Sequence, residues 1–328
     1  MKILVTGGAG YIGSHVARCL VEEEHDIVVL DNLVKGHREA VAGGKFIKGD
    51  LENLDLLNKI MQKEDIEGVI HLAAHSLVGE SMENPGKYYQ NNVSNGVNLL
   101  EAMVDNGVEH IVFSSTAAVY GEPEEIPITE EHPLKPTNTY GESKLFFEKI
   151  LKRYNQIYDM NYCSLRYFNA AGADPSGEIG EAHDPETHLI PIVLQKALRE
   201  REELYIFGND YPTRDGTCIR DYIHVNDLAQ ALILAIESLA RGKESNIYNL
   251  GNGEGYSVKE VIDTASEVVG KKIEAKDGER RPGDPAVLVA SSEKIKKDLN
   301  WEPEYPDLET IIKTAWEWHR KGGFNENE

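Results

Sequence analysis

Long apolar runs are missing from this chain of 328 residues. Nowhere does an apolar run approach the roughly 20 residues that a membrane-spanning helix requires. The first ten residues, MKILVTGGAG, contain one lysine and then a short apolar stretch broken by glycines, which is too short for the apolar region of a signal peptide. We therefore expect a soluble protein that binds no membrane.

Cysteine is also scarce. Cys19, Cys163 and Cys218 are odd in number and scattered, and their spacing matches no metal-binding pattern. Such usage is typical of reduced thiols in a cytoplasmic protein rather than of a disulfide framework. The sequence thus predicts a cytoplasmic chain without a metal site.

Basic residues are few relative to acidic ones. The chain has 34 Lys plus Arg against 56 Asp plus Glu, a formal net charge of −22. A polyanion of this kind is repelled by nucleic acid and by anionic lipid. Nucleic-acid binding is therefore disfavoured, although a local basic pocket for a small anionic ligand stays compatible with this composition.

What the sequence does contain is an alternation of strand-like and helix-like segments. Helical patterns begin at Tyr11 and after Asn84-Pro85, where Asn84 is a candidate N-cap for a helix reaching about Asn106. The strand-like runs are residues 2–6, 26–31, 45–50, 68–74, 110–115 and 161–169. This rhythm predicts an α/β fold built on a doubly wound parallel (Rossmann) sheet.

A second, smaller lobe follows. After Asn169 the chain becomes rich in loops, and a helix begins near His188. We place the boundary there, with one lobe at residues 1–168 and a second at residues 169–328. The second lobe is expected to be discontinuous, because segments around residues 219–240 read as elements that return to the first.

A glycine-rich turn, TGGAGYIG at residues 6–13, lies between the first strand and the first helix. Gly7, Gly10 and Gly13 have the spacing that lets backbone N–H groups approach a pyrophosphate at a helix N-terminus. Asp31 ends the second strand, where an acid binds adenosine ribose hydroxyls and repels a 2′-phosphate. NAD is therefore favoured over NADP, although the nearby cations Lys35 and Arg38 argue in the other direction. Asp50 is either a contact for the adenine amine or a loop cap.

Tyr140 and Lys144 in NTYGESK are four residues apart, so that they share one face of a helix. A phenol with a pKa of about 10 is a poor base at neutral pH. A neighbouring ammonium and an oxidised nicotinamide ring would both favour the phenolate. Thr116, at the end of the strand in FSSTAAVYG, would supply a hydroxyl to the same substrate oxygen. Such a pair is often only structural, but the upstream dinucleotide turn favours proton transfer.

Several further motifs accompany these, over nearly the whole chain: LDNL, IHLAAHSLVGESMENPGKYYQNNV, RYFNAAGADPSGEIGE, IFGNDYPTRDGTCIRDYIHVNDLA, YNLGNGEGYSV and RRPGDPA. With them the sequence resembles the extended short-chain dehydrogenase/reductase family, and within it the UDP-glucose 4-epimerases, also called UDP-galactose 4-epimerases.

The resemblance implies a mechanism and a division of labour. Tyr140 would take the proton of the sugar 4-hydroxyl while hydride passes from C4 to bound NAD, and hydride return to the other face of the 4-keto sugar would invert C4. The first lobe would bind NAD through Gly7, Gly10, Tyr11, Ile12, Gly13, Asp31, Asn32, Asp50, Leu51, Ala73, Ala74, His75, Asn92, Tyr140, Lys144 and Phe168. The second would bind the UDP-sugar through Asn169, His188, Leu189, Tyr205, Phe207, Arg220, Tyr222, Arg281, Asp284 and Leu288, together with Thr116.

Two positions depart from the family pattern. His188 stands where asparagine is common, and His75 where lysine is often found. Ala117 and Ala118 follow Thr116, whereas the related 4,6-dehydratases carry an Asp-Glu pair there to eliminate water. The sequence therefore favours epimerisation over elimination.

Other readings stay open. Leu288 stands where a large residue excludes an N-acetyl group and a small one admits it, so UDP-N-acetylhexosamine remains an alternative substrate, as do UDP-pentoses and UDP-uronates. A net-oxidising dehydrogenase and a catalytically silent NAD-sensing regulator are more remote alternatives. The family pattern also implies a homodimer formed through the helix after Asn84 and the helix that carries Tyr140.

Overall fold

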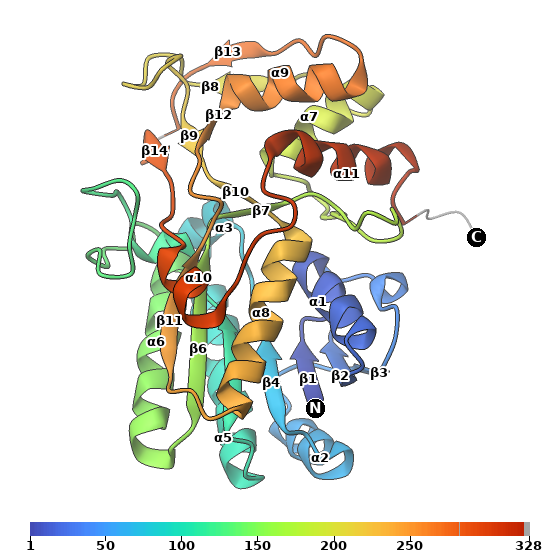
Figure 1. The fold of residues 1–328 in the computed structure, drawn as a ribbon, viewed down its shortest axis with the longest axis vertical. Coiled ribbons are helices and arrows are strands. Elements are labelled where there is room, and N and C mark those ends of the chain that lie inside the picture. Colours follow the sequence, from blue (N-terminus) through green and yellow to red (C-terminus); the bar gives the residue numbers. More distant parts are fainter. Residues whose placement is uncertain (282, 325–328) are drawn as a thin grey trace.

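A parallel sheet of seven strands forms the base of the molecule, in the order β11-β6-β5-β4-β1-β2-β3 (Figure 1). The structure, a computed structural model, describes residues 1–281 and 283–324. The strands are β1 (Lys2–Thr6), β2 (Asp26–Asp31), β3 (Lys45–Lys48), β4 (Gly68–His71), β5 (His110–Ser114), β6 (Asn161–Tyr167) and β11 (Asn246–Leu250). The order reverses between β1 and β4, the crevice where Rossmann folds bind ligands. The predicted fold class is confirmed.

Helices cover both faces of this sheet, which explains why its strands are apolar throughout. On one face lie α1 (Tyr11–Glu22) and α8 (Val225–Ala240), which pack against each other. On the other lie α2 (Leu54–Glu64), α5 (Asn95–Asp105) and α6 (Thr139–Tyr158). Ile3, Leu4 and Val5 of β1 are completely buried as a result.

The helical segment around Asn84 is more divided than its sequence pattern indicates. Helix α3 (Val78–Glu83) precedes α4 (Pro85–Tyr89), and a π-helical stretch, η2 (Gln90–Ser94), joins α4 to α5. Pro85 occupies the first turn of α4, but the Asn84 side chain makes no capping hydrogen bond. π-Helical turns often mark functional sites, and this one carries the buried Asn92.

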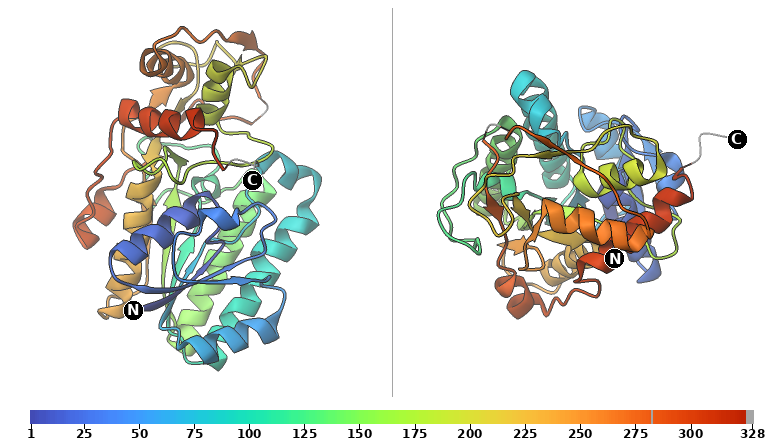
Figure 2. Two further views of the ribbon diagram at one scale, coloured as in Figure 1. Left: turned by 90° about the vertical axis from the view of Figure 1, so that its right-hand side faces the viewer. Right: turned by 90° about the horizontal axis from the view of Figure 1, so that it is seen from above.

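The smaller lobe lies beyond the carboxyl ends of the strands (Figures 1 and 2). Its helices α7, α9 and α11 share one apolar core. Their bounds are α7 (Leu189–Leu198), α9 (Val258–Val269) and α11 (Leu308–Arg320), and its short strands are β7 (Asn169–Ala171), β8 (Tyr205–Phe207), β9 (Ile219–Arg220), β10 (Tyr222–His224), β12 (Tyr256–Ser257), β13 (Lys276–Gly278) and β14 (Val287–Leu288). Single 3-10 turns, η1 (Arg38–Ala40) and η3 (Ala117–Val119), lie in the larger lobe.

The chain returns to the larger lobe over a longer stretch than residues 219–240. Helix α8 does pack on the main sheet, whereas β9 and β10 pair with strands of the smaller lobe. Strand β11 then joins the sheet beside β6, and α10 (Glu293–Leu299) packs against β11 and α8. The seventh strand is thus contributed by residues far beyond the first lobe in sequence.

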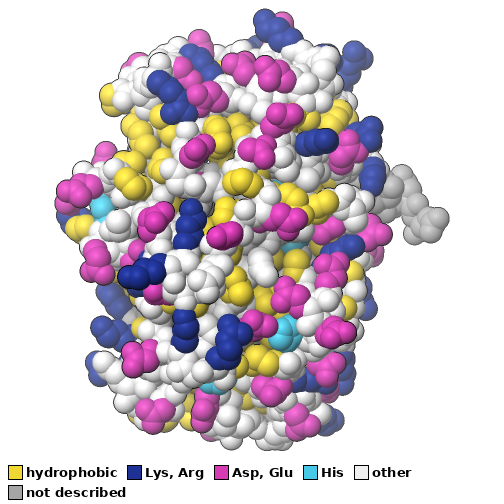
Figure 3. Space-filling view, in the orientation of Figure 1, with side chains coloured by type: hydrophobic (Ala, Val, Ile, Leu, Met, Phe, Trp, Pro, Cys, Tyr) yellow, Lys and Arg dark blue, Asp and Glu magenta, His cyan; other side chains and the backbone are white. Residues whose placement is uncertain are grey.

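Charge is distributed over the surface. Figure 3 shows acidic side chains spread over both lobes on the face in view, without one acidic patch.

Within the described residues, no helix combines the length and the apolar character needed to cross a bilayer.

A buried ion pair ties α6 to the sheet. Arg166 of β6 donates to both carboxylate oxygens of Glu148, from Nε at 2.9 Å and from Nη2 at 2.6 Å. Both side chains are under 5% exposed. Ser115 donates to the same carboxylate, and the Arg166 guanidinium donates to the Tyr120 hydroxyl. Bidentate geometry and these additional bonds compensate the cost of removing both charges from water.

The first prediction concerns this pair. Glu148→Gln leaves the Arg166 charge buried and uncompensated, so we expect the free energy of unfolding to fall by about 3 kcal/mol. Chemical denaturation measures this. The control is Glu124→Gln, which breaks an exposed pair with Lys135 and should change stability little. Equal, small effects of both substitutions would contradict the structural role assigned to Glu148.

Candidate active site

A cavity of about 530 Å³ opens between the carboxyl ends of the strands and the smaller lobe. Both lobes line it, so the chain brings together residues that are far apart in sequence. The predicted site residues in its wall are Gly7, Gly10, Tyr11, Ile12, Gly13, Asp31, Asn32, Asp50, Leu51, Ala73, Ala74, His75, Thr116, Tyr140, Lys144, Phe168, Asn169, His188, Arg220, Asp284 and Leu288.

Six predicted residues do not line this cavity: Asn92, Leu189, Tyr205, Phe207, Tyr222 and Arg281. Leu189 and Tyr222 pack into the core of the smaller lobe. Tyr205 and Phe207 are exposed on β8, where the Arg281 guanidinium carbon lies 4.2 Å from the centre of the Phe207 ring. These side chains lie around the site rather than in its wall.

Asn92 does not line the cavity but forms hydrogen bonds to residues that support its wall. Its side-chain oxygen accepts the backbone N–H of His75 at 2.9 Å, and its amide donates to the backbone oxygen of His75 at 3.0 Å. The same amide donates to the Ser143 hydroxyl, which itself donates to the backbone oxygen of Tyr140. Asn92 therefore fixes the turn at His75 against the helix that carries Tyr140.

The glycine-rich turn forms a cradle that side chains would fill. Gly7 has a φ of +72°, and a Cβ there would lie 2.6 Å from the backbone nitrogen of Ala73. A Cβ on Gly13 would lie 2.1 Å from the backbone oxygen of Gly7. Helix α1 begins here without a side-chain cap, so the first-turn N–H groups remain to bind an anion. This arrangement fits a dinucleotide diphosphate.

Asp31 stands at the end of β2, beside this turn. It is 8% exposed, and it accepts the backbone N–H of Ala9 at 3.0 Å and that of Leu33 at 2.8 Å. Its carboxylate is thus fixed at the cavity, where it suits ribose hydroxyls. Both nearby cations are occupied elsewhere: Lys35 donates to the backbone oxygen of Asp184, and Arg38 stacks on Phe46.

Asp50 caps a loop, which is one of the two roles that its position in the sequence left open. It accepts the backbone N–H of Glu52 at 3.0 Å, which is a loop-capping contact. It also accepts a hydrogen bond from the Asn32 amide at 2.7 Å, and both side chains line the cavity. The two side chains thus form one polar part of the cavity wall.

Tyr140 lies in the first turn of α6. Asn138 caps this helix by accepting the backbone N–H of Gly141 at 2.8 Å. One turn later, the Lys144 ammonium donates to the backbone oxygen of Ser114 at 2.7 Å and lies 5.9 Å from the centre of the Tyr140 ring. The predicted pair therefore shares one helix face, beside the end of β5.

Burial controls the charges of this pair. Burial raises the pKa of Tyr140, whereas a hydrogen bond with the Thr116 hydroxyl lowers it. Burial lowers the pKa of Lys144 to about 7, although the Glu148 carboxylate one turn further along α6 favours the ammonium. Protein groups alone therefore leave Tyr140 a neutral phenol, and a further positive charge in the cavity is needed to favour phenolate.

Thr116 joins the pair from the end of β5. Its hydroxyl accepts the backbone N–H of Ala118 at 3.2 Å as the cap of η3. Ala117 and Ala118 also line the cavity, and they offer only methyl groups. Positions 117 and 118 therefore place no carboxylate in the wall beside Thr116.

On the smaller lobe, Arg220 and Asp284 form an ion pair across two segments. Arg220 belongs to β9 and Asp284 to the turn before β14. Arg220 keeps further donors that suit diphosphate oxygens. Leu288 of β14 lies nearby in the cavity wall and packs with Phe168 beside a small apolar cluster.

Sequence reasoning missed several residues of the cavity wall, among them Glu181 and His183. Glu181 and His183 line the wall opposite the glycine-rich turn, in the loop before α7. Although burial opposes its charge, the Glu181 carboxylate raises the pKa of His183. The alternation of acids and histidines in EAHDPETH was a usable signal, but only the folded loop turns these side chains toward the cavity.

Comparison with known proteins agrees with this geometry. The model of the NAD dependent epimerase/dehydratase family matches residues 3–251. The chain is 56% identical over 321 residues to a UDP-glucose 4-epimerase of Halalkalibacterium halodurans, covering 98% of this chain and 96% of that protein.

Solved structures agree as well. A crystal structure of a UDP-glucose 4-epimerase has a TM-score of 0.97 and 53% identity, covering 99% of this chain and 100% of that one. A UDP-glucose 4-epimerase from Brucella ovis in complex with NAD has a TM-score of 0.94 and 44% identity, covering 96% and 97%. The resemblance read from the motifs is confirmed: this chain belongs to the NAD dependent epimerase/dehydratase family.

Proposed function

We propose that this protein interconverts UDP-glucose and UDP-galactose by inverting C4 of the sugar while NAD stays bound. The observation that carries the proposal is the meeting of Tyr140, Lys144 and Thr116 in one cavity with the glycine-rich turn. The likeness to UDP-glucose 4-epimerases over nearly the whole chain supports the choice of reaction.

The two lobes divide the binding. Residues 1–168 hold NAD, with the diphosphate at the glycine-rich turn, a ribose at Asp31 and the adenine toward Asn32 and Asp50. Residues 169–328 hold the UDP-sugar, apart from the segments that return to the main sheet. Arg220 binds its diphosphate, while Asn169, Leu288 and His188 line the space between the two ligands.

Arg281, Phe207 and Tyr205 extend the UDP site beyond the cavity wall. They form an exposed aromatic and cationic group on the smaller lobe. A uracil ring can stack on such a surface, and the Arg281 guanidinium can reach an adjacent phosphate. Leu189 and Tyr222, which are packed beneath, support this surface from the core.

Proton transfer falls to Tyr140. When bound, NAD supplies a hydride acceptor and donor for sugar C4 and a positive nicotinamide ring. That charge, with the Lys144 ammonium, lowers the pKa of Tyr140 against the effect of burial. Tyr140 then takes the proton of the sugar 4-hydroxyl and returns it to the oxygen of the 4-keto sugar, while Thr116 holds that oxygen.

The arrangement argues against elimination. With alanine at positions 117 and 118, no carboxylate there takes or gives a proton at neighbouring sugar carbons. The reaction left to the 4-keto sugar is return of the hydride to C4. C4 is inverted when the keto sugar presents its other face to that hydride. A net-oxidising enzyme would consume NAD, and a silent regulator would have no use for the three catalytic side chains.

The proposal also includes a homodimer and a cytoplasmic location for the protein. Phe146 is an exposed apolar side chain on α6, one of the two predicted dimer helices, and Val78 and Met82 are exposed on α3, which lies just before Asn84. Contact between two copies of the chain would remove these apolar side chains from water, which supports a homodimer. The free thiols of the three cysteines support a cytoplasmic location.

The direct test is incubation of the purified protein with UDP-galactose, without added cofactor, followed by NMR. Formation of UDP-glucose with no accumulation of NADH is expected. Conversion only after NAD is supplied would contradict tight cofactor binding, and no conversion even then would contradict the sugar assignment.

Tyr140→Phe tests the assigned base. We expect turnover of UDP-galactose to fall by roughly 10²–10⁴-fold, because the ring remains but no oxygen exchanges a proton with the substrate. The matched control is Tyr158→Phe on the same helix, where the side chain is exposed. Near-normal turnover in Tyr140→Phe would overturn the assignment.

Lys144→Met tests the cation. Turnover should fall by roughly 10²-fold or more, since no ammonium then stabilises phenolate at Tyr140. Lys152→Met, an exposed lysine of the same helix, is the control and should keep wild-type turnover.

Lys144→Met also tests the burial of Lys144, through the pH dependence of protein stability. Burial lowers the pKa of Lys144 from 10.5 to about 7, so between these values the unfolded chain binds more protons than the folded one. Wild-type stability relative to Lys144→Met should therefore rise with pH across this interval and then level off. Denaturation of the NAD-free protein measures it, and a pH-independent difference would contradict the burial of an ionisable group.

Leu288 tests substrate choice. Leu288→Ala enlarges the wall near the sugar and should raise turnover of UDP-N-acetylgalactosamine relative to UDP-galactose, whereas Leu288→Tyr should lower that ratio. Leu288→Ile keeps the volume and serves as control. NMR of both substrates gives the ratio, and equal ratios in all variants would remove Leu288 from the specificity pocket.

A further inference from the structure

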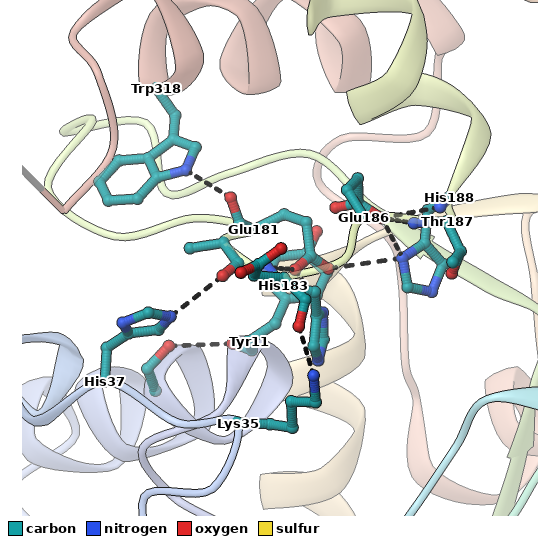
Figure 4. Close-up of polar contacts among 12 residues, drawn as sticks. Tyr11, Lys35, His37, Glu181, His183, Glu186, Thr187, His188 and Trp318 are labelled. Atoms are coloured by element: carbon teal, nitrogen blue, oxygen red, sulfur yellow. Dashed lines mark hydrogen bonds and ion pairs between the residues drawn. The ribbon is translucent and has the colours of Figure 1, made fainter. Parts of the chain in front are cut away.

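Two histidines and a glutamate come together in the wall of the cavity. Glu181, His183 and His188 each present a ligand atom, and these atoms all lie within 4.8 Å of one another. All three belong to the segment between β7 and the start of α7. Figure 4 shows Glu181 and His183 between Trp318 on one side and Tyr11, Lys35 and His37 on the other.

The distances suit a small divalent metal ion. Glu181 Oε1 lies 2.5 Å from Nδ1 of His183, and Glu181 Oε2 lies 3.9 Å from Nδ1 of His188. Zinc binds nitrogen and oxygen ligands at about 2.0–2.2 Å, which places neighbouring ligand atoms of a tetrahedral site roughly 3.4 Å apart. The observed distances bracket this value, so that small side-chain rotations suffice to close a site.

The partner of His183 is the Glu181 carboxylate, which it meets at an ion-pair distance but without hydrogen-bond geometry. Its Nδ1 is buried and has no hydrogen-bond partner within the described residues, so its close approach to Glu181 is an ion-pair distance without hydrogen-bond geometry. A buried polar nitrogen that makes no well-aligned hydrogen bond costs free energy. Coordination of a metal ion by this nitrogen removes that cost.

The loop that carries the cluster is held from both lobes. Trp318 Nε1 donates to the backbone oxygen of Glu181 at 2.8 Å, and His37 Nε2 donates to that of Ala182 at 3.0 Å. Lys35 donates to the backbone oxygen of Asp184. Such backbone anchors fix ligands before a metal arrives, as supporting contacts do in metal sites generally.

Glu186 stands beside the cluster. Its Oε1 accepts the backbone N–H groups of Thr187 at 2.6 Å and His188 at 2.7 Å, and lies 2.8 Å from Nδ1 of His188. A metal at this nitrogen replaces the contact between the two side chains. The two backbone bonds then keep the Glu186 carboxylate within reach as a further ligand.

Charge gives the cluster a reason to bind a cation. Glu181 and His183 line the cavity and also a small second pocket, in both cases together with Gly10 and Tyr11 of the glycine-rich turn. Under the proposed function this turn holds the cofactor diphosphate. A carboxylate facing a diphosphate is repulsive, whereas a divalent ion between them attracts both.

We propose that Glu181, His183 and His188 bind Zn²⁺ or a divalent transition metal of similar ligand preference, with an open coordination position toward the glycine-rich turn. This position takes an oxygen of the cofactor diphosphate, a contact that rests on the proposed function. The metal site itself does not rest on it. Cysteine spacing does not bear on this proposal, because the proposed ligands are histidine and carboxylate.

Zn²⁺ binding to the purified protein is the first test. After dialysis against a chelator, equilibrium dialysis with elemental analysis should find one Zn²⁺ per chain. The double variant His183→Ala with His188→Ala should weaken this binding by about 100-fold or more. Glu181→Gln, which keeps the shape of the side chain, should also weaken it, and guards against misfolding of the double variant.

His25→Ala is the matched control, because His25 belongs to a second surface group with Glu23 and Glu237. Binding lost in this variant but kept in the double variant would overturn the proposal, as would absence of stoichiometric Zn²⁺ from the wild type. Neither result depends on epimerase activity.

Retention of NAD is the second test. The protein carrying Zn²⁺ should release NAD several-fold more slowly during gel filtration than the chelator-treated protein, and the double variant should show no such difference. Equal release with stoichiometric Zn²⁺ would remove the diphosphate contact and leave the metal site. A protein that binds Zn²⁺ but never holds NAD would contradict the proposed function instead.

Discussion

One hydrogen bond organises the catalytic end of the molecule: the buried Lys144 ammonium donates to the backbone oxygen of Ser114. It joins α6 to the end of β5, so that Tyr140 on the helix and Thr116 after the strand face the same space. The buried Glu148–Arg166 pair, one turn further along α6, holds the same helix against β6. The position of the phenol is therefore set by charged contacts that are themselves removed from water.

That burial has a chemical consequence. It opposes both the Tyr140 phenolate and the Lys144 ammonium, the two charged forms that the proposed mechanism uses. In the proposed mechanism, the Tyr140 phenolate therefore forms with the help of a cationic ligand, because the chain alone does not favour it. Under the proposed mechanism, Tyr140 becomes a base only when a dinucleotide lies in the crevice between β1 and β4, so that cofactor retention and catalysis are linked.

Local patterns in the sequence predicted much of this structure. The glycine spacing, the acid ending β2 and the four-residue step from Tyr140 to Lys144 depend on neighbours in the chain, and each lies in the cavity wall as expected. The seventh strand, the π-helical turn at Asn92 and the position of Arg281 on Phe207 depend on distant partners. Glu181 and His183 show the same limit, because their role follows from a loop that Trp318 and His37 hold from opposite sides.

The most direct test follows the hydrogen at C4. UDP-galactose carrying deuterium at C4 would be incubated with the protein in ordinary water, without added cofactor, and the UDP-glucose formed would be examined by NMR. If hydride leaves C4 and returns to the same carbon, the product keeps its deuterium at C4. Replacement of that deuterium by solvent hydrogen would contradict the account.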